Sequence, residues 1–466
     1  MYIVIGFPSM NQKTLLGFIL LILILVAFPL TNAVRVNPDT IETQNNQDSH
    51  FYQNEHEVAE GYTLMGIIPT TMKKGGYFAL LIDMDGNEIK RWAVTPDPAK
   101  MLPGGTIIAP TGEYYKEWDN TNLTQLDWNG TIEWDFSGWA KDDIGRFMAR
   151  EHHDFQREGN PVGYYAPGQD FVPYGTTLIL AHNTIYNPNI SRKTIIDDVI
   201  YEVFWNGTLT GFEWHASDHI SEMGLDPKTR VGIWFNPGGP GLILGCLPGD
   251  WLHINSMSLL GENKWYDAGD ERFNPENIII SSRHASFIAI ISRQTGDIVW
   301  LCGPDFPKTG NNGTGVGRLI GLHSVHIIPE GLPGAGNILL FDNGGFSGYG
   351  LFGFPKLIRF YSRVLEFNPI TFEVVQEYSH RNGLYPYPRS GDYHKLFSMT
   401  LCSVQRLPNG NTLVSEGLSG RVFELTSTNK VVWDYIYPDA RFFMYRAYRV
   451  PPEWVPGNPS GYDPWE

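Results

Sequence analysis

Six stretches of the sequence repeat one form: an alternating apolar run, a tight turn, and a second run that ends in an aromatic residue. Turn pairs such as Asp85-Gly86 and Asn129-Gly130 supply the positive φ that a short hairpin loop needs. A single hairpin cannot bury its apolar face alone, so repeated hairpins must pack against one another. The stretches are YFALLIDMDGNEIKRW ending at Trp92, TQLDWNGTIEW at Trp134, IYEVFWNGTLTGFEW at Trp214, FIAIISRQTGDIVW at Trp300, VLEFNPITFEVVQEY at Tyr378 and VFELTSTNKVVW at Trp433.

A second motif precedes the hairpin, most clearly in LCSVQRLPNGNTLVSEG (401–417) and LHSVHIIPEGLPGAGNILLFDNG (322–344). The unit is therefore four short antiparallel strands, and 50 Gly, 32 Pro and only 18% charged residues suit many strands joined by turns. We predict an all-β fold, a six-bladed β-propeller over residues 61–450. The uneven spacing of the units implies long inter-blade insertions. An irregular β-sandwich is the alternative.

The ends of the chain differ from this repeat. Lys13 precedes an apolar run from Leu15 to Leu30 and small residues ending at Ala33, so residues 1–33 are predicted to be a signal peptide or an N-terminal membrane anchor. Residues 15–33 would then be a membrane tether if the segment is kept. Residues 34–60 are polar and lack periodicity, which indicates a tether. Residues 451–466 are a Pro-rich tail, too rich in proline to form a regular element.

These features predict export, with the protein secreted, periplasmic or anchored to the outer face of a membrane. Five N-x-S/T sequons are compatible with that location. They lie at Asn122, Asn129, Asn189, Asn206 and Asn312. The spacing of Cys246, Cys302 and Cys402 does not reveal a disulfide. The formal charge of −16 argues against a nucleic-acid partner.

Aligning the repeats on their turns brings three histidines to matching places on the innermost strands. His323 lies six residues before Pro329, as His153 lies six before Gly159. Cys402 takes the same place in a sibling unit, and a further unit has His253 with Asn255 on the same face of a strand. Because inner strands line the central channel of a propeller, His153, His253 and His323 should converge there.

The next strand of each unit adds further candidates. Counting from Asn277, Asn337 and Thr176, the seventh position is Arg283, Asn343 and His182. Alternation places His323 on one face with Val325 and Ile327, and His326 on the other. The adjacent His152 is an alternative to His153, since the pair leaves the register uncertain by one. The spacing of His215 and His219 would suit two ligands of one metal only on a helix, and this stretch follows a strand. We therefore expect no metal, and we also expect no cofactor.

Four motifs together resemble the bacterial and archaeal arylsulfotransferase (aryl-sulfate sulfotransferase) family, over roughly residues 75–440. They are DWLHINS, SSRH, GLHSV with GNILLFDNG, and LPNGNTLVSEGLSGRVFEL. The resemblance implies a six-bladed propeller that moves a sulfuryl group from an aryl sulfate to a phenol without a nucleotide donor. It matches His323 to the nucleophile that forms a sulfohistidine, His253 and Asn255 to an H-x-N pair, and Arg283 to the arginine of SSRH. His153, or His152, matches the remaining pocket histidine.

This chemistry suits the residue types. A neutral imidazole is a competent nucleophile near pH 7, and a covalent intermediate divides the transfer into two displacements in a ping-pong cycle. His323, His253, Arg283 and His153 are the predicted catalytic residues, because donors aimed at the sulfuryl oxygens stabilise developing charge. Substrate binding is predicted for Asn255, Asn343, His182 and His152.

Other functions use the same fold. With water as acceptor the site would act as an aryl sulfatase-like hydrolase, and without chemistry the propeller would be a ligand- or glycan-binding surface protein. The stretch TGDIVW resembles a blade motif of quinone-dependent dehydrogenases, which generally have eight such blades and a calcium-binding carboxylate set that this sequence lacks. The sequence leaves the donor, the acceptor and any homo-oligomer open.

Overall fold

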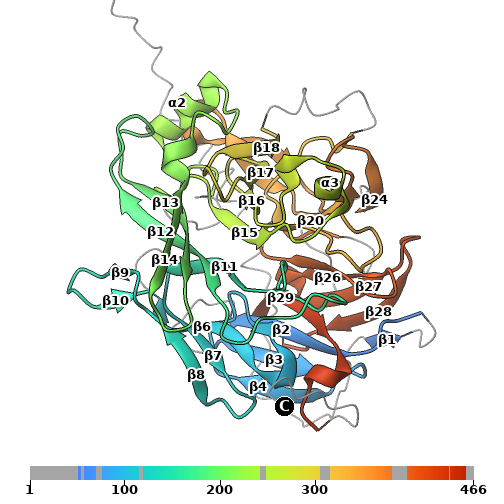
Figure 1. Ribbon diagram of the computed structural model, residues 1–466. Helices are drawn as coiled ribbons and strands as arrows, with labels where there is room; N and C mark the ends of the chain where they lie inside the picture. Colours follow the sequence, from blue (N-terminus) through green and yellow to red (C-terminus); the bar gives the residue numbers. More distant parts are fainter. Residues whose placement is uncertain are drawn as a thin grey trace, which may run out of the picture. The chain divides into compact units, whose positions relative to one another are not determined.

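The computed structural model describes residues 51–53, 57–69, 76–114, 119–241, 248–304, 315–379, 396–439 and 441–457. These residues belong to one compact unit, Ser49–Glu466. Strands dominate it, in the antiparallel order that repeated hairpins produce, and its helices are short (Figure 1). The helices α2 and α3 span Pro227–Phe235 and Lys264–Asp267. The all-β prediction is confirmed, with the strands in a β-propeller arrangement.

Four sheets of the described residues are separate blades of four or five antiparallel strands. One blade pairs the last strand of the chain with the first hairpin: β29 (Phe442–Val450), β2 (Tyr62–Pro69), β3 (Phe78–Ile82) and β4 (Glu88–Trp92). Another is β15 (Ile254–Leu259), β16 (Ile278–Ser282), β17 (Phe287–Ile291) and β18 (Ile298–Cys302). The next is β19 (His323–Ile327), β20 (Ile338–Asp342), β23 (Arg363–Phe367) and β24 (Val374–Ser379). The fourth is β25 (Ser403–Arg406), β26 (Thr412–Glu416), β27 (Arg421–Leu425), β28 (Val431–Ile436) and β1 (Phe51–Gln53).

The structure differs from the prediction of six separate blades, because two of the hairpin units share one large sheet. Eight strands form a continuous sheet, because Asn120 of β7 pairs with Glu151 of β11 and joins two hairpin units. Its strands are β5 (Lys100–Met101), β6 (Ile107–Tyr114), β7 (Asn120–Leu126), β8 (Ile132–Phe136), β11 (Glu151–Arg157), β12 (Thr177–Ile185), β13 (Ile195–Val203) and β14 (Leu209–His215). Two small ribbons lie outside these sheets: β9 (Ala140–Lys141) with β10 (Phe147–Met148), and β21 (Gly345–Tyr349) with β22 (Pro355–Arg359).

Apolar clusters join neighbouring hairpin units around the molecule. One buries Ile179 of β12 against Trp134 of β8, and another buries Trp433 of β28 against Leu80 of β3. The last blade therefore packs on the first, and Figure 1 shows β2 and β3 (blue) beside β28 and β29 (red). Burial of these faces is the main stabilising contribution of the fold.

The aromatic residues that end the repeats pack between neighbouring hairpin units. Trp134 donates its indole N–H to the carbonyl of Trp205 at 2.9 Å, and Trp214 donates to Gly296 at 3.0 Å. Trp300 donates to Pro369 at 3.1 Å, and Trp433 donates to Met84 at 3.0 Å. Each acceptor lies in the turn of the next hairpin, so the indole joins one hairpin unit to the following one.

The predicted boundaries at both ends need correction. Within the predicted tether, Phe51–Gln53 is strand β1 and pairs with Trp433–Tyr435 of β28. Within the predicted tail, Pro452–Trp454 forms a 3-10 turn and the Trp454 side chain is buried against the first blade. Packed structure therefore extends beyond residues 61–450 on both sides. The predicted segment 1–33 lies outside the described residues, and within the described part no helix has the length and apolar character to cross a membrane.

The inner strands β11, β15, β19, β25 and β29 contact one another in turn around the centre. A buried ion network fills the space between them, where Asp154 Oδ1 lies 2.7 Å from Lys100 Nζ and Asp154 Oδ2 lies 3.0 Å from Arg446 Nη1. The cavity beside this network holds only about 20 Å³. The described part of the centre is therefore packed around Asp154.

Left-handed residues interrupt the inner strands near the predicted site. His153 has φ 60°, His253 has φ 51° and Ser324 has φ 54°. At Ser324 the extra residue changes the register, so His323 lies opposite Phe341 and His326 lies opposite Leu339. These partners are two residues apart, so His323 and His326 share a face, contrary to the simple alternation.

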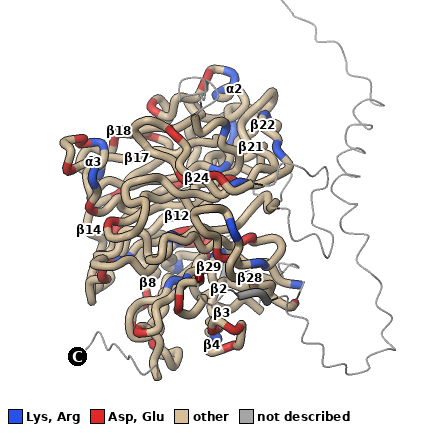
Figure 2. Tube along the Cα trace, turned by 90° about the vertical axis from the view of Figure 1, so that its right-hand side faces the viewer, with Lys and Arg blue, Asp and Glu red and all other residues tan. Residues whose placement is uncertain are grey.

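Charged residues of both signs are interspersed along the chain. In the view of Figure 2, Lys and Arg lie beside Asp and Glu, including around α2 and α3. The net charge of −16 is therefore not gathered into one acidic face in that view.

Candidate active site

His323 begins β19 and is held by acceptors on one side of its ring. Its Nδ1 lies 2.8 Å from Asn343 Oδ1 and 3.0 Å from the Gly321 carbonyl. Asn343 in turn donates through Nδ2 to the carbonyls of Ser398 and Leu401, which fixes its Oδ1 toward the histidine. Because both partners of Nδ1 are acceptors, Nδ1 carries the hydrogen and Nε2 carries the lone pair.

Burial keeps His323 neutral. The pKa of His323 is well below its ordinary value because burial, and next the Arg283 guanidinium, disfavour the protonated form. Arg283 follows β16, and its Nη2 donates to the Met399 carbonyl at 3.1 Å. The arrangement combines a neutral imidazole with a nearby fixed positive charge, which suits attack on an anionic electrophile.

His253 is held by a carboxylate that the sequence analysis did not include. Its Nδ1 lies 2.5 Å from Asp250 Oδ2, and its side chain is 12% exposed. The pKa of Asp250 is low despite the opposing effect of burial, because His253 and then His284 favour the carboxylate. An ionised carboxylate behind an imidazole supports proton transfer at the opposite ring nitrogen.

Of the two adjacent histidines, His153 faces the other candidates. Its ring centroid lies 4.6 Å from that of His253, and its pKa is well below the ordinary value because of burial and then of His253. His152 is buried on the far side, with its ring stacked on His182 at 3.5 Å. The two rings are linked by a 2.9 Å contact between their Nδ1 atoms. The structure thus brings His323, Arg283, His253 and His153 together and leaves His152 behind them.

The residues predicted to bind substrate are instead occupied by protein contacts. Asn255 donates to the Leu322 carbonyl at 2.9 Å and accepts from Ser281 at 2.9 Å, so it anchors the peptide before His323. Asn343 orients His323, as described above. His182 is buried, and its Nδ1 lies 2.6 Å from Asp119 Oδ1. We therefore describe Asn255 and Asn343 as positioning residues.

Several polar residues around the site went unrecognised in the sequence. They are Asp119, Asp198, Asp250 and His284. Asp250 stands three residues before His253, and His284 directly follows Arg283. The motifs DWLHINS and SSRH therefore already contain both residues. No local pattern points to Asp119 or Asp198, because burial and neighbours alone distinguish them from other aspartates.

His215 and His219 do not meet. His215 Nε2 lies 2.7 Å from Glu213 Oε1, and His219 Nδ1 lies 2.9 Å from Glu222 Oε1. Cys402 is buried, and burial raises its thiol pKa to about 12. Its sulfur accepts from the Gly417 N–H at 3.3 Å, so it packs as a filler beside Asn343.

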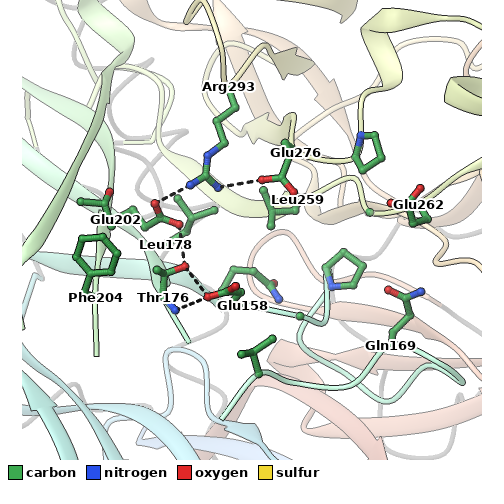
Figure 3. A pocket seen from close by; sticks show the side chains of 17 residues that line it. Glu158, Gln169, Thr176, Leu178, Glu202, Phe204, Leu259, Glu262, Glu276 and Arg293 are labelled. Carbon is green, nitrogen blue, oxygen red and sulfur yellow. Dashed lines mark hydrogen bonds and ion pairs between the residues drawn. The ribbon is translucent and has the colours of Figure 1, made fainter. Parts of the chain in front are cut away.

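A separate cavity of about 490 Å³ lies at the other end of β11 from His153. Glu158, Glu202 and Glu276 line it, and Arg293 lies 2.6 Å from Glu202 and 3.8 Å from Glu276 (Figure 3). None of the candidate residues contributes to its wall. Its acidic lining is poorly suited to a sulfate ester, so we place the candidate site at the histidines.

Fold and site together define a class: a β-propeller with a cluster of histidines and one arginine where its inner strands begin. The family model of the arylsulfotransferases (ASST) matches residues 47–436. The chain belongs to this family, and membership supports a sulfotransferase that acts on small aryl sulfates and phenols. No curated protein matches the chain.

Solved structures similar to the chain are distant in sequence. A protein of unknown function from Bacteroides caccae is 10% identical, with a TM-score of 0.44, over 84% of this chain and 99% of that one. Virginiamycin B lyase from Staphylococcus aureus is 10% identical, with a TM-score of 0.33, over 82% and 90%. The β-propeller domain of Cps50 (Swd1) from Myceliophteria thermophila is 6% identical, with a TM-score of 0.37, over 84% and 90%. These similarities carry no information about activity.

Proposed function

We propose that the protein is an exported aryl-sulfate sulfotransferase that works through a sulfohistidine intermediate on His323. The supporting observation is the hydrogen-bonding of this ring, whose Nδ1 contacts Asn343 Oδ1 and the Gly321 carbonyl and whose Nε2 keeps its lone pair. Low pKa and fixed tautomer together keep the nucleophile ready at neutral pH.

In the first displacement, His323 Nε2 attacks the sulfur of the aryl sulfate. The N–S bond forms as the bond between sulfur and the aryl oxygen breaks, and the phenolate leaves with that bonding pair. His253, supported by the Asp250 carboxylate, gives the phenolate a proton. Arg283 and His153 stabilise the sulfuryl oxygens, where negative charge is concentrated.

In the second displacement, the acceptor phenol gives its proton to His253 and its oxygen attacks the sulfur. The N–S bond breaks, and its electron pair returns to His323 Nε2. The enzyme regains its starting state, which is the requirement of a ping-pong cycle. No nucleotide or metal takes part in these two steps.

Export and architecture extend this proposal. Residues 1–33 would direct the chain out of the cytoplasm as a cleaved signal peptide or keep it attached as an anchor. We also propose that the eight-stranded sheet acts as two blades, because among the described strands a single β pairing, between β7 and β11, joins its halves. A six-bladed ring would result, and a homo-oligomer is compatible with it.

The test is an assay of purified protein with p-nitrophenyl sulfate, with and without added phenol, beside the variant His323→Ala. Nitrophenolate release that rises with phenol and disappears in the variant, together with a mass increase of one sulfuryl group on His323, is the expected result. Nitrophenolate release at the same rate with and without phenol would favour hydrolysis. A folded protein that releases nothing from a panel of aryl sulfates would favour a binding propeller.

A further inference from the structure

Three buried side chains behind the channel histidines bring unpaired polar atoms together. His152 Nε2, His182 Nε2 and Asp198 Oδ2 have no hydrogen-bond partner among the described residues. The three side chains are at most 4% exposed. Leaving a buried polar atom without a partner is costly, so three in one place call for a ligand that satisfies them together.

Their separations approach those of a metal site. His152 Nε2 lies 3.5 Å and His182 Nε2 lies 3.9 Å from Asp198 Oδ1, and one ligand atom from each residue lies within 4.8 Å of the others. With bonds of about 2.0–2.1 Å to nitrogen or oxygen, tetrahedral ligand atoms stand roughly 3.3–3.4 Å apart. Closing the site around one ion also requires a ring to turn, because the His152 and His182 rings are stacked at 3.5 Å with 15° between their planes.

The hydrogen bond of the His182 ring favours the tautomer that can coordinate a metal. Its Nδ1 donates to Asp119 Oδ1 at 2.6 Å, so its lone pair is on Nε2, toward Asp198. Asp119 is itself held by Arg150, at 2.6 Å. A carboxylate behind a histidine is the usual support of a metal ligand, because it fixes the ring and makes the nitrogen more basic.

Charge balance also favours a cation here. Asp197 is compensated by His215 at 3.8 Å and Asp250 by His253, whereas the ion-pair contacts of Asp198 are with His152 and His182. Both of these contacts of Asp198 Oδ1 are long, at 3.5 Å and 3.9 Å, and its Oδ2 has no hydrogen-bond partner among the described residues. Burying an uncompensated carboxylate is costly, and a bound cation removes that cost.

We propose that His152, His182 and Asp198 bind one divalent first-row transition-metal ion of the zinc class. Two imidazoles and one carboxylate select such an ion over Mg²⁺ or Ca²⁺, which prefer oxygen ligands. The neighbouring group of Asp250, His253 and His284 is a poorer site, because Asp250 Oδ2 is already taken by His253. This assignment differs from the sequence analysis, which expected no metal.

An ion at this place would also set the tautomers of the channel. With the metal on His152 Nε2, His152 Nδ1 keeps its hydrogen and donates it to His153 Nδ1 across the 2.9 Å contact. His153 then carries its own hydrogen on Nε2, where it can donate to a sulfuryl oxygen. Only this consequence rests on the proposed function, and the metal site stands or falls without it.

The experiment uses the full-length protein, stripped with a chelator and titrated with Co²⁺ while visible absorption is recorded. We expect one equivalent to bind with the bands of a four- or five-coordinate site, and Zn²⁺ to displace it. His182→Gln should weaken Co²⁺ binding by at least about 100-fold, and Asp119→Asn, which keeps all three ligands, by about 10- to 100-fold. The matched control is His284→Gln, which should bind as the wild type does.

Two results would overturn the proposal. One is the absence of stoichiometric Co²⁺ binding by protein whose circular dichroism shows it to be folded. The other is binding that survives His182→Gln and is lost in His284→Gln, which would put the ion in the neighbouring group. Because the readout is binding, the result does not depend on whether the protein transfers a sulfuryl group.

Discussion

At the scale of single residues, the site depends on how hydrogen bonds hold an uncharged ring. Asn343 cannot rotate, because its Nδ2 is committed to two backbone carbonyls, and its Oδ1 is therefore aimed at His323. Asn255 acts on His323 indirectly, by donating to the carbonyl of the preceding residue, Leu322. Asn343 and Asn255, which the sequence predicts to bind substrate, thus hold the His323 ring and the peptide before it in place.

The first prediction concerns Asn343. Asn343→Ala removes the acceptor that fixes the ring of His323, so we expect kcat for nitrophenyl sulfate turnover to fall by about 10- to 100-fold with a smaller change in KM. Asn87→Ala, at an exposed turn, is the control and should be neutral. Unchanged kcat in a folded Asn343→Ala protein would contradict the assigned role.

The second prediction concerns pH and His326. Burial lowers the pKa of His326 from 6.5 to about 4, and its ring contacts Tyr164 Oη and the Ser324 carbonyl. Above pH 6.5 both folded and unfolded chains hold it neutral. Below pH 6.5 only the unfolded chain gains the proton, so the free energy of unfolding falls until about pH 4.

Denaturation at pH 7 and pH 4.5 measures this effect. The His326 contribution to the loss of stability should be about 2–3 kcal/mol. His326→Gln should lose correspondingly less stability between the two pH values than the wild type does. Equal losses in both proteins would show that the folded His326 is protonated as readily as the unfolded one.

At the scale of elements, each hairpin unit is joined to the next by an aromatic residue at the end of its outer strand. The indole N–H groups of Trp134, Trp214, Trp300 and Trp433 all reach backbone carbonyls of the following unit. Repetition of this contact explains why the sequence shows the repeat so clearly. Trp92 is the exception, since its buried Nε1 has no hydrogen-bond partner among the described residues.

The third prediction uses this difference. Trp300→Phe deletes a buried hydrogen bond to the Pro369 carbonyl, whereas Trp92→Phe deletes none in the described structure. Both changes remove similar apolar area. Trp300→Phe should therefore lower the free energy of unfolding by about 1–3 kcal/mol more than Trp92→Phe does. Chemical denaturation of the two variants measures this difference. Equal losses in the free energy of unfolding would show that the hydrogen bond does not contribute to stability.

At the scale of the whole molecule, the central network ties distant parts of the chain together. Asp154 on β11 accepts from Lys100 of β5, Arg446 of β29 and the Met257 N–H of β15. All three partners are buried, and they belong to different sheets. The network therefore fills the described part of the centre between the inner strands.

The fourth prediction tests this network. Asp154→Asn leaves Lys100 and Arg446 buried without their carboxylate, so we expect a loss of about 3–5 kcal/mol in the free energy of unfolding. The exposed pair Glu88–Arg91 is the matched control, and Glu88→Gln should cost under about 1 kcal/mol. Similar losses in the two variants would mean that water reaches Asp154 and weakens the buried pair.

Much of this protein follows from local sequence. Alternating runs, tight turns and terminal aromatics determine the strands and the packing of neighbouring hairpins, because both depend on side-chain period and on burial of one face. The repeat also predicted that His323, Arg283 and His253 converge, since a repeat places equivalent positions at equivalent points of the fold, and the structure brings them together. The motifs likewise indicated the family, and the family match over residues 47–436 confirms it.

Tertiary structure decided the rest. The continuous eight-stranded sheet depends on one pairing, between Asn120 and Glu151, and the periodicity of the sequence does not predict it. Bulges at left-handed residues put His323 and His326 on one face, because one extra residue reverses a two-residue period. Asp119 and Asp198 are remote in sequence from the histidines that they contact, and only folding brings their charges there. Sequence determines which elements form, whereas contacts between remote elements determine which polar atoms stay unpaired and ready for a ligand.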